Sequence, residues 1–160
     1  VAEPFVFQAK ENKLLFHTNI QTSEENHFFD KDVIQKIVTN LLSNALKYTP
    51  ENHTIDFSTE IKNENLFLSV TNAGVQLKND DLPKLFQRFY QKTETQNGVG
   101  IGLALVKELV DLYQGTITTT LENDKLTFLL SLPLTISKDK NILIVTEQIQ
   151  LTNNEREVNE

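Results

Sequence analysis

Residues 97–110 read NGVGIGLALVKELV and hold three of the five glycines in the 160-residue chain, Gly98, Gly100 and Gly102. Apolar residues then recur at helical spacing, at Ile101, Leu105, Leu109 and Leu112. This spacing predicts an amphipathic helix. Glycine lets a backbone approach a ligand closely, and a helix N-terminus offers free N–H groups to an anion. The stretch is therefore a candidate phosphate-binding loop.

The alternatives for this loop are two other nucleotide-binding motifs and a purely structural role. A dinucleotide-binding fingerprint needs G-x-G-x-x-G directly after a strand. Here G-V-G-I-G follows the polar run QKTETQN, residues 91–97, and no Walker G-K-[ST] sequence occurs in the chain. In the alternative without a ligand, the glycines form only a flexible connection. The choice depends on what the rest of the chain places beside the loop.

Composition limits the class of partner and of site. The net charge is −7, without a basic stretch, which argues against nucleic acid or an anionic membrane surface because both need clustered Lys and Arg. No apolar run approaches the ~18 residues of a membrane span. The absence of cysteine excludes disulfides and thiolate metal sites and fits a reducing compartment. Because methionine is also absent and the chain begins at Val1, we expect it to be a piece of a longer protein.

Helical and strand periods alternate along the chain. Apolar spacing predicts a helix over 31–48, entered through Asp30 or Asp32 and stopped by Pro50, and a second over 101–113, ended by Gly115. We also expect a short strand at 14–17, two strands around a turn at 63–65, a short helix within 80–90, and a hairpin that turns near 123–124. Helices on one face of a mixed, mainly antiparallel sheet make a two-layer α/β sandwich.

The first long helix carries an unusual polar edge. Asn40, Asn44 and Lys47 follow one another at intervals of four and three residues, so they project from one narrow side next to the apolar stripe. They could simply solvate the helix surface. Asparagine is a poor helix former, however, so two of them within a helix need a reason. An amide oxygen is a hard, neutral ligand suited to Mg²⁺, and a nearby ammonium can contact phosphate.

These pieces resemble the ATP-binding catalytic domain of sensor histidine kinases, in the gyrase, Hsp90, histidine kinase and MutL superfamily. FFDKDVIQKIVTNLLSNALKYTP resembles the N box, VTNAGVQL a divergent G1 box, LPKLFQRFYQ the F box and NGVGIGLALVKEL the G2 box. The resemblance covers about residues 1–134 and implies the Bergerat ATP-binding fold. It also implies that residues 91–99 form a mobile lid over the nucleotide.

The resemblance implies a role for each matching residue. Asn40 and Asn44 would orient Mg²⁺ and phosphate, Lys47 would contact phosphate, Tyr48 would pack near the nucleotide and Arg88 would approach the γ-phosphate. The G2 box would hold the β- and γ-phosphates, through Gly98, Gly100, Gly102 and Leu103. ATPase relatives carry a glutamate as general base where Asn40 stands. Because a neutral amide cannot take a proton from water, we expect poor hydrolysis and transfer to an external imidazole instead.

The G1 box departs from the family pattern at two positions. Asn72 replaces the aspartate that accepts a hydrogen bond from the adenine amino group, and Gln76 replaces the second glycine, although Gly74 remains. An amide oxygen can still accept that bond. The alternative function is therefore a degenerate nucleotide-binding fold that serves as a non-catalytic interaction module.

The expected partners lie outside this chain. His17, His27 and His53 stand in strand or turn contexts, where we expect them to be solvated rather than catalytic. The phosphoacceptor histidine would belong to a dimerisation domain of the same parent protein, which would be a homodimer. This chain would be a cytoplasmic domain of that parent, a membrane-anchored sensor. Residues 135–160 would form a linker that leads into a response-regulator receiver, as in hybrid kinases, because KNILIVTEQIQL resembles a receiver's first strand. An ordinary strand or a disordered tail explains this segment equally well.

Overall fold

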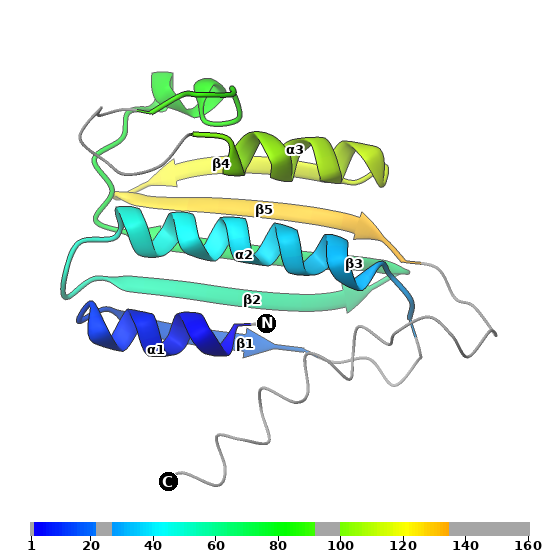
Figure 1. The fold of residues 1–160 in the computed structure, drawn as a ribbon, viewed down its shortest axis with the longest axis horizontal. Helices are drawn as coiled ribbons and strands as arrows, with labels where there is room; N and C mark the ends of the chain where they lie inside the picture. The colour runs from blue at the N-terminus through cyan, green and yellow to red at the C-terminus, as the bar shows by residue number, and fades with distance from the viewer. Residues whose placement is uncertain (1, 22–26, 92–99, 135–160) are drawn as a thin grey trace, which may run out of the picture.

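The computed structural model describes residues 2–21, 27–91 and 100–134, and its elements are shown in Figure 1. In chain order they are α1 (Glu3–Glu11), β1 (Leu15–Ile20), α2 (Lys31–Tyr48), β2 (Thr54–Lys62), β3 (Asn65–Ala73), the 3₁₀ helix η1 (Asn79–Lys84), α3 (Gly102–Leu112), β4 (Thr116–Glu122) and β5 (Lys125–Pro133). No helix in the described ranges is long and apolar enough to cross a membrane. The expected segment 135–160 and nearly all of the expected lid lie outside these ranges.

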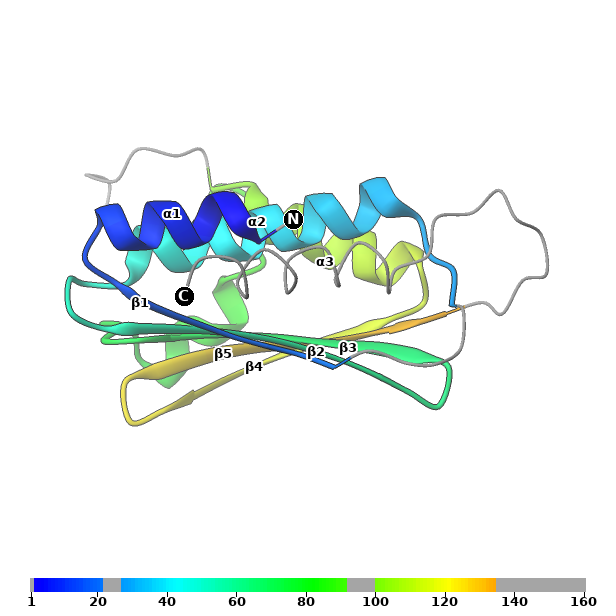
Figure 2. The ribbon, with the colours of Figure 1, turned by 90° about the horizontal axis from the view of Figure 1, so that it is seen from below.

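The five strands form one sheet in the order β1-β2-β3-β5-β4. β1 runs parallel to β2, and the other neighbouring pairs are antiparallel. Figure 2 shows α1, α2 and α3 together on one face of this sheet. The predicted two-layer α/β sandwich with a mixed, mainly antiparallel sheet is therefore confirmed.

The core lies between α2 and the helix-facing side of the central strands. Alternate residues of β3 and β5 are buried against the helices, as the two-residue period of a strand requires. The buried apolar side chains of α2 are Val33, Ile37, Val38, Leu41, Leu42, Ala45 and Leu46. Their spacing places them along one stripe, so the polar edge of α2 borders the core.

Helix α2 begins where the sequence predicts. The side chain of Asp30 accepts hydrogen bonds from the backbone N–H groups of Asp32 and Val33, at 2.9 and 3.3 Å. Such an N-cap satisfies donors that have no partner within the helix. Asp30 also accepts a bond of 3.0 Å from the hydroxyl of Tyr113, which follows the last residue of α3. One carboxylate therefore both starts α2 and ties it to the end of α3.

Several boundaries differ from the sequence prediction. Helix α1 was not expected, because it buries only Phe5 and Ala9 and so has little apolar periodicity. β1 continues to Ile20 rather than ending at residue 17, since pairing with β2 supports the extra residues. Of the short helix expected within 80–90, only a 3₁₀ segment that ends at Lys84 is formed.

The end of α3 also differs in its cause. The left-handed residue after the helix is Gln114, with φ of 57°, rather than Gly115. A Cβ atom at Gly115 would lie 2.4 Å from the carbonyl oxygen of Ser131 in β5. This glycine is needed for close approach to the sheet rather than for a positive φ. By contrast, both predicted hairpin turns contain two residues with positive φ, namely Asn63, Glu64, Asn123 and Asp124.

Candidate functional site

The polar edge of α2 meets the beginning of α3. A Cβ atom added at Gly102 would lie 2.7 Å from Oδ1 of Asn40. The Nδ2 group of Asn40 donates a hydrogen bond of 2.7 Å to the carbonyl of Lys36, which fixes the orientation of the amide. The amide oxygen of Asn40 is therefore held against the first residue of α3. A side chain at position 102 would clash with this oxygen unless the Asn40 side chain moved.

The N-terminus of α3 is open to an anion. No side chain in the described part of the chain caps it, and its N-cap residue is Ile101. The first N–H groups of a helix have no partner within the helix and carry the positive end of its dipole. Leu103 packs its side chain against the hydrophobic core. What Leu103 can offer to a ligand is therefore its backbone N–H.

Gly100 connects this N-terminus to the segment that follows η1. Its φ is 70°, and its carbonyl accepts a hydrogen bond of 2.8 Å from the N–H of Phe89. A Cβ atom at position 100 would lie 3.0 Å from backbone atoms of Phe89 and Tyr90. Gly100 is thus required both by its positive φ and by close backbone approach. Gly98 lies outside the described residues.

Asn72 lies on the helix-facing side of β3. It follows Leu68 and Val70 in the row of buried residues, and it has no exposed surface. Its partners in the neighbouring strands are the apolar residues Ile55 and Leu126. Among the residues that the structure describes, neither Oδ1 nor Nδ2 of Asn72 has a hydrogen-bond partner. Leaving such groups buried and unpaired costs about 1–3 kcal/mol, so this amide needs a reason to be there.

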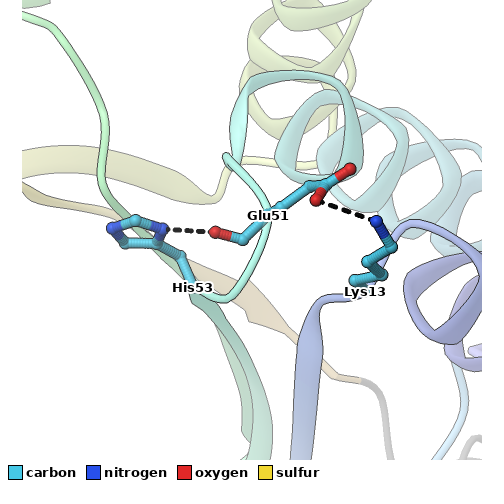
Figure 3. Close-up of polar contacts among 3 residues, drawn as sticks. All are labelled: Lys13, Glu51 and His53. Carbon is cyan, nitrogen blue, oxygen red and sulfur yellow. Dashed lines mark hydrogen bonds and ion pairs between the residues drawn. The ribbon is translucent and has the colours of Figure 1, made fainter.

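The backbone just after Asn72 is supported by a histidine. Gly74 has φ of 73°, and a Cβ atom there would lie 2.5–2.9 Å from ring atoms of His53. Figure 3 shows the contacts that hold this ring: its Nδ1 lies 3.0 Å from the carbonyl oxygen of Glu51, and the carboxylate of Glu51 lies 3.1 Å from Nζ of Lys13. A carbonyl can only accept, so Nδ1 of His53 carries the proton.

The three histidines were all expected to be exposed to solvent, and the structure confirms this for two of them. His17 is exposed on β1, where its Nδ1 lies 2.9 Å from Oδ1 of Asp56. The expectation that His27 is solvated was wrong, because only 3% of its surface is exposed. His53 is exposed as expected, but its ring packs on Gly74. Sequence reasoning missed this supporting role because nothing in a single sequence links residues 53 and 74.

Lys47 lies on the other side of α2 from α3. Its Nζ is 5.1 Å from the centroid of the Tyr48 ring, within the range of a cation–π contact. It also borders a shallow cavity of about 320 Å³ between α1 and α2, together with Gln8, Glu11, Asn12, Ser43 and Leu46. Asn44 and Tyr48 are half-buried on α2. Lys47 would have to turn its flexible chain away from α1 to reach a ligand at Gly102.

Arg88 is held by the outer surface of α3. Its Nε and Nη2 atoms both donate to Oε1 of Glu108, the first at 3.1 Å. About half or more of each side chain is exposed, 64% for Arg88 and 53% for Glu108, so the pair contributes little to stability. In this arrangement the guanidinium lies on α3 rather than at the N-terminus of the helix.

The family model for histidine kinase-, DNA gyrase B- and HSP90-like ATPases matches residues 29–136, more than half of the chain. The chain belongs to this family. The sensor histidine kinase WalK of Bacillus subtilis is 34% identical over an alignment of 131 positions, which covers 78% of this chain and 21% of WalK. The heme sensor protein HssS of Staphylococcus aureus is 30% identical over 128 residues, 79% of this chain and 28% of HssS. The chain thus spans less than a third of these relatives.

Solved structures of the histidine kinase-like ATPase family have the same fold. The catalytic domain of histidine kinase ThkA superposes with a TM-score of 0.72 at 22% identity, covering 82% of this chain and 86% of that chain. Full-length ShkA in complex with AMPPNP superposes with a TM-score of 0.74 at 22% identity, covering 85% of this chain and 29% of ShkA. The likeness confirms the fold predicted from the four sequence boxes.

The histidine kinase-like ATPase fold brings some of the predicted residues together and leaves others apart. Asn40 and Gly102 touch, and Gly100 lies two residues before Gly102 at the start of α3. Asn72 faces the same layer of helices from the sheet below. Lys47 and Arg88 are engaged elsewhere, with Tyr48 and Glu108. The predicted roles of Lys47 and Arg88 in contacting phosphate therefore remain predictions.

Proposed function

We propose that this domain binds Mg-ATP and transfers the γ-phosphate to a histidine on a separate dimerisation domain of a parent sensor kinase. The observation that carries the proposal is the amide oxygen of Asn40 held against Gly102, at the open N-terminus of α3. This arrangement places a hard oxygen ligand beside a row of N–H donors. Mg²⁺ bridged to phosphate oxygens needs both.

The described residues fit such a ligand at both of its ends. The glycine at position 102 lets the amide oxygen of Asn40 lie against the start of α3, because a Cβ atom there would lie only 2.7 Å from that oxygen. At the other end, the unpaired amide of Asn72 lacks the partner that an adenine base would supply. Asn40 and Asn44 would hold Mg²⁺ through their amide oxygens, and Asn72 would accept from the adenine amino group. When bound, the ion would neutralise charge on the phosphates.

The neutral amide of Asn40, where ATPase relatives carry a glutamate, favours transfer over hydrolysis. Asn40 is neutral, and its Nδ2 is already used by the carbonyl of Lys36, so it cannot take a proton from water. The nucleophile would instead be an imidazole nitrogen supplied by the other domain. This chain would bind the nucleotide, orient it and exclude water.

An exposed apolar surface gives the partner domain a place to bind. Phe89, Ile101, Leu105 and Leu112 are each between 38% and 73% exposed, and they lie along α3 and the segment tied to its start by the bond from Phe89 to Gly100. A helical dimerisation domain that packs here would bring its histidine to the N-terminus of α3. A response regulator would receive the phosphate next; the structure of ThkA in complex with the response regulator TrrA supports that class of partner.

A second function is favoured by the G1 departures. Asn72 and Gln76 replace the residues that the family pattern carries, so the fold could serve as an interaction module that no longer binds a nucleotide. The two functions differ in one measurable property, the binding of ATP.

Titration with a fluorescent ATP analogue, with and without Mg²⁺, tests the proposal. We expect saturable binding that strengthens with Mg²⁺ and falls by about tenfold or more when Asn44→Leu removes an amide ligand. Asn19→Leu, at an exposed position of β1 on the far side of the sheet, is the matched control and should bind as the native chain does. No binding to the native chain would favour the interaction module.

Phosphate transfer needs a second measurement. We expect negligible phosphate release by the chain alone, and labelling of an acceptor hairpin from the same parent when both are mixed with labelled ATP. Robust phosphate release without an acceptor would favour the hydrolase members of the family.

A further inference from the structure

The part of the proposed nucleotide site that would contact the purine base contains one neutral amide. The side chain of Asn72 has no exposed surface, and its Oδ1 and Nδ2 atoms have no hydrogen-bond partner in the described part of the chain. On either side along the sheet, β2 and β5 present only Ile55 and Leu126 at its register. Within the described residues, both the acceptor and the donor of this amide are therefore unpaired.

An amide and a carboxylate offer a purine different hydrogen-bonding groups. An ionised aspartate is acceptor-only, whereas the asparagine amide has an oxygen acceptor and an NH₂ donor side by side. Adenine presents its amino donor next to a ring nitrogen acceptor. Guanine presents the reverse pair, a carbonyl acceptor next to a ring N–H donor. An amide can match either pair by turning over by 180°.

Burial does not prevent this turn. The oxygen and the NH₂ group of an asparagine are so similar in size that they are hard to tell apart in electron density. The two orientations of Asn72 therefore fit the same space, and no hydrogen bond to a described residue fixes one of them. A side chain held by a protein partner would lose that partner on turning, but Asn72 has no such partner within residues 2–21, 27–91 and 100–134.

We infer that Asn72 makes this a site for purine nucleotides of both kinds, so that GTP binds within about tenfold of ATP, a difference of about 1.4 kcal/mol. The inference rests on the proposed nucleotide site. ATP and GTP carry the same ribose and triphosphate, so the ratio of their dissociation constants isolates the base. An aspartate at this position would place a negative charge against the guanine carbonyl and leave that oxygen unpaired.

The test is calorimetric titration of the full chain with ATP and with GTP in the presence of Mg²⁺, at pH 8, where an ordinary carboxylate is ionised. We expect a GTP-to-ATP ratio of dissociation constants below about 10 for the native chain and above about 100 for Asn72→Asp. Asn19→Asp, which makes the same change of charge at an exposed position of β1, should leave the native ratio unchanged.

A variant without charge covers the case in which a buried aspartate unfolds the chain. Asn72→Leu keeps the branched shape at Cγ and removes both polar groups, so it should weaken ATP and GTP to a similar degree. Weakening of ATP alone would overturn the inference, because guanine would then not touch this residue. A native chain that binds ATP but binds GTP more than about tenfold more weakly would overturn it as well and leave the proposed function intact. Binding of neither nucleotide would overturn the proposed function itself.

Discussion

The Oδ1 atom of Asn40 lies 2.7 Å from the position that a Cβ atom would take at Gly102. These residues belong to different helices and stand 62 positions apart in the sequence. Their contact brings the polar edge of α2 to the glycine-rich start of α3.

Gly102→Ala should therefore weaken Mg-ATP binding without unfolding the chain. Position 102 begins a helix, where alanine is favourable by about 1 kcal/mol relative to glycine, but its methyl group would displace the Asn40 amide. We expect a loss of about tenfold in affinity, measured by titration with the fluorescent analogue.

A double-mutant cycle separates this mechanism from a general effect on the loop. If the methyl group acts through Asn40, Gly102→Ala should cost much less in an Asn40→Ala background. Additive losses would mean that the two residues affect the ligand independently, and the contact would then have no part in binding.

Substitutions at two neighbouring positions after α3 should change the free energy of unfolding in opposite directions. Gly115→Ala should lower the free energy of unfolding by about 1–3 kcal/mol, because the added Cβ would lie 2.4 Å from the Ser131 carbonyl oxygen. Gln114→Gly should raise it by about 0.5–1 kcal/mol, because glycine relieves the cost of a left-handed residue. Urea unfolding of both variants and the native chain measures this, and destabilisation by both would contradict the assignment of their roles.

The cap of α2 should make stability depend on pH at the acidic end. The Val33 N–H and the Tyr113 hydroxyl hold the pKa of Asp30 below its usual 3.8. A carboxyl whose folded pKa is lowered contributes stability that is present above the unfolded pKa and is lost as the pH falls through the folded pKa. At pH values below about 4, the free energy of unfolding should therefore decrease more steeply for the native chain than for Tyr113→Phe. This variant removes one of the two hydrogen bonds that lower the pKa of Asp30.

The same hydrogen bond predicts a second effect at alkaline pH. Its bond to Asp30 raises the pKa of Tyr113 above the usual 10.0, so the neutral hydroxyl is favoured in the folded chain. This contribution is present below the unfolded pKa and is lost as the pH rises through the folded one. Thermal melts from pH 3 to pH 11 compare the two chains, and parallel curves at both ends would show that the bond is not formed in solution.

Freeing Arg88 should strengthen the binding of ATP more than that of ADP. Glu108→Gln removes the carboxylate that both guanidinium nitrogens now contact, so Arg88 could turn towards a γ-phosphate. Because the pair is exposed, the free energy of unfolding should change by no more than about 1 kcal/mol.

Asp111→Asn is the matched control for that change. It removes a carboxylate from the same helix, where Asp111 pairs with Lys107 rather than with Arg88, and it alters the net charge equally. Equal gains in ATP affinity from both variants would point to a general charge effect, and the predicted role of Arg88 would then lose its support.

The sequence alone determined the elements whose causes lie within a few residues. Asp30 starts α2 because its carboxylate reaches N–H groups two and three positions ahead, and the turns at 63–64 and 123–124 depend on residues that tolerate positive φ. The strands follow from an alternation of apolar residues that a single chain displays. The order of the four boxes was enough to predict the family, which the comparisons show.

Only the tertiary structure decided what those elements place together. The contact of Asn40 with Gly102, the packing of His53 on Gly74 and the pairing of Arg88 with Glu108 each join residues 20 or more positions apart. The isolation of the Asn72 amide is set by two strands that flank β3, and α1 is stabilised by docking more than by its own periodicity. Such features depend on which surfaces meet when the layers pack, and burial against a distant partner leaves no periodic trace in the sequence around either residue.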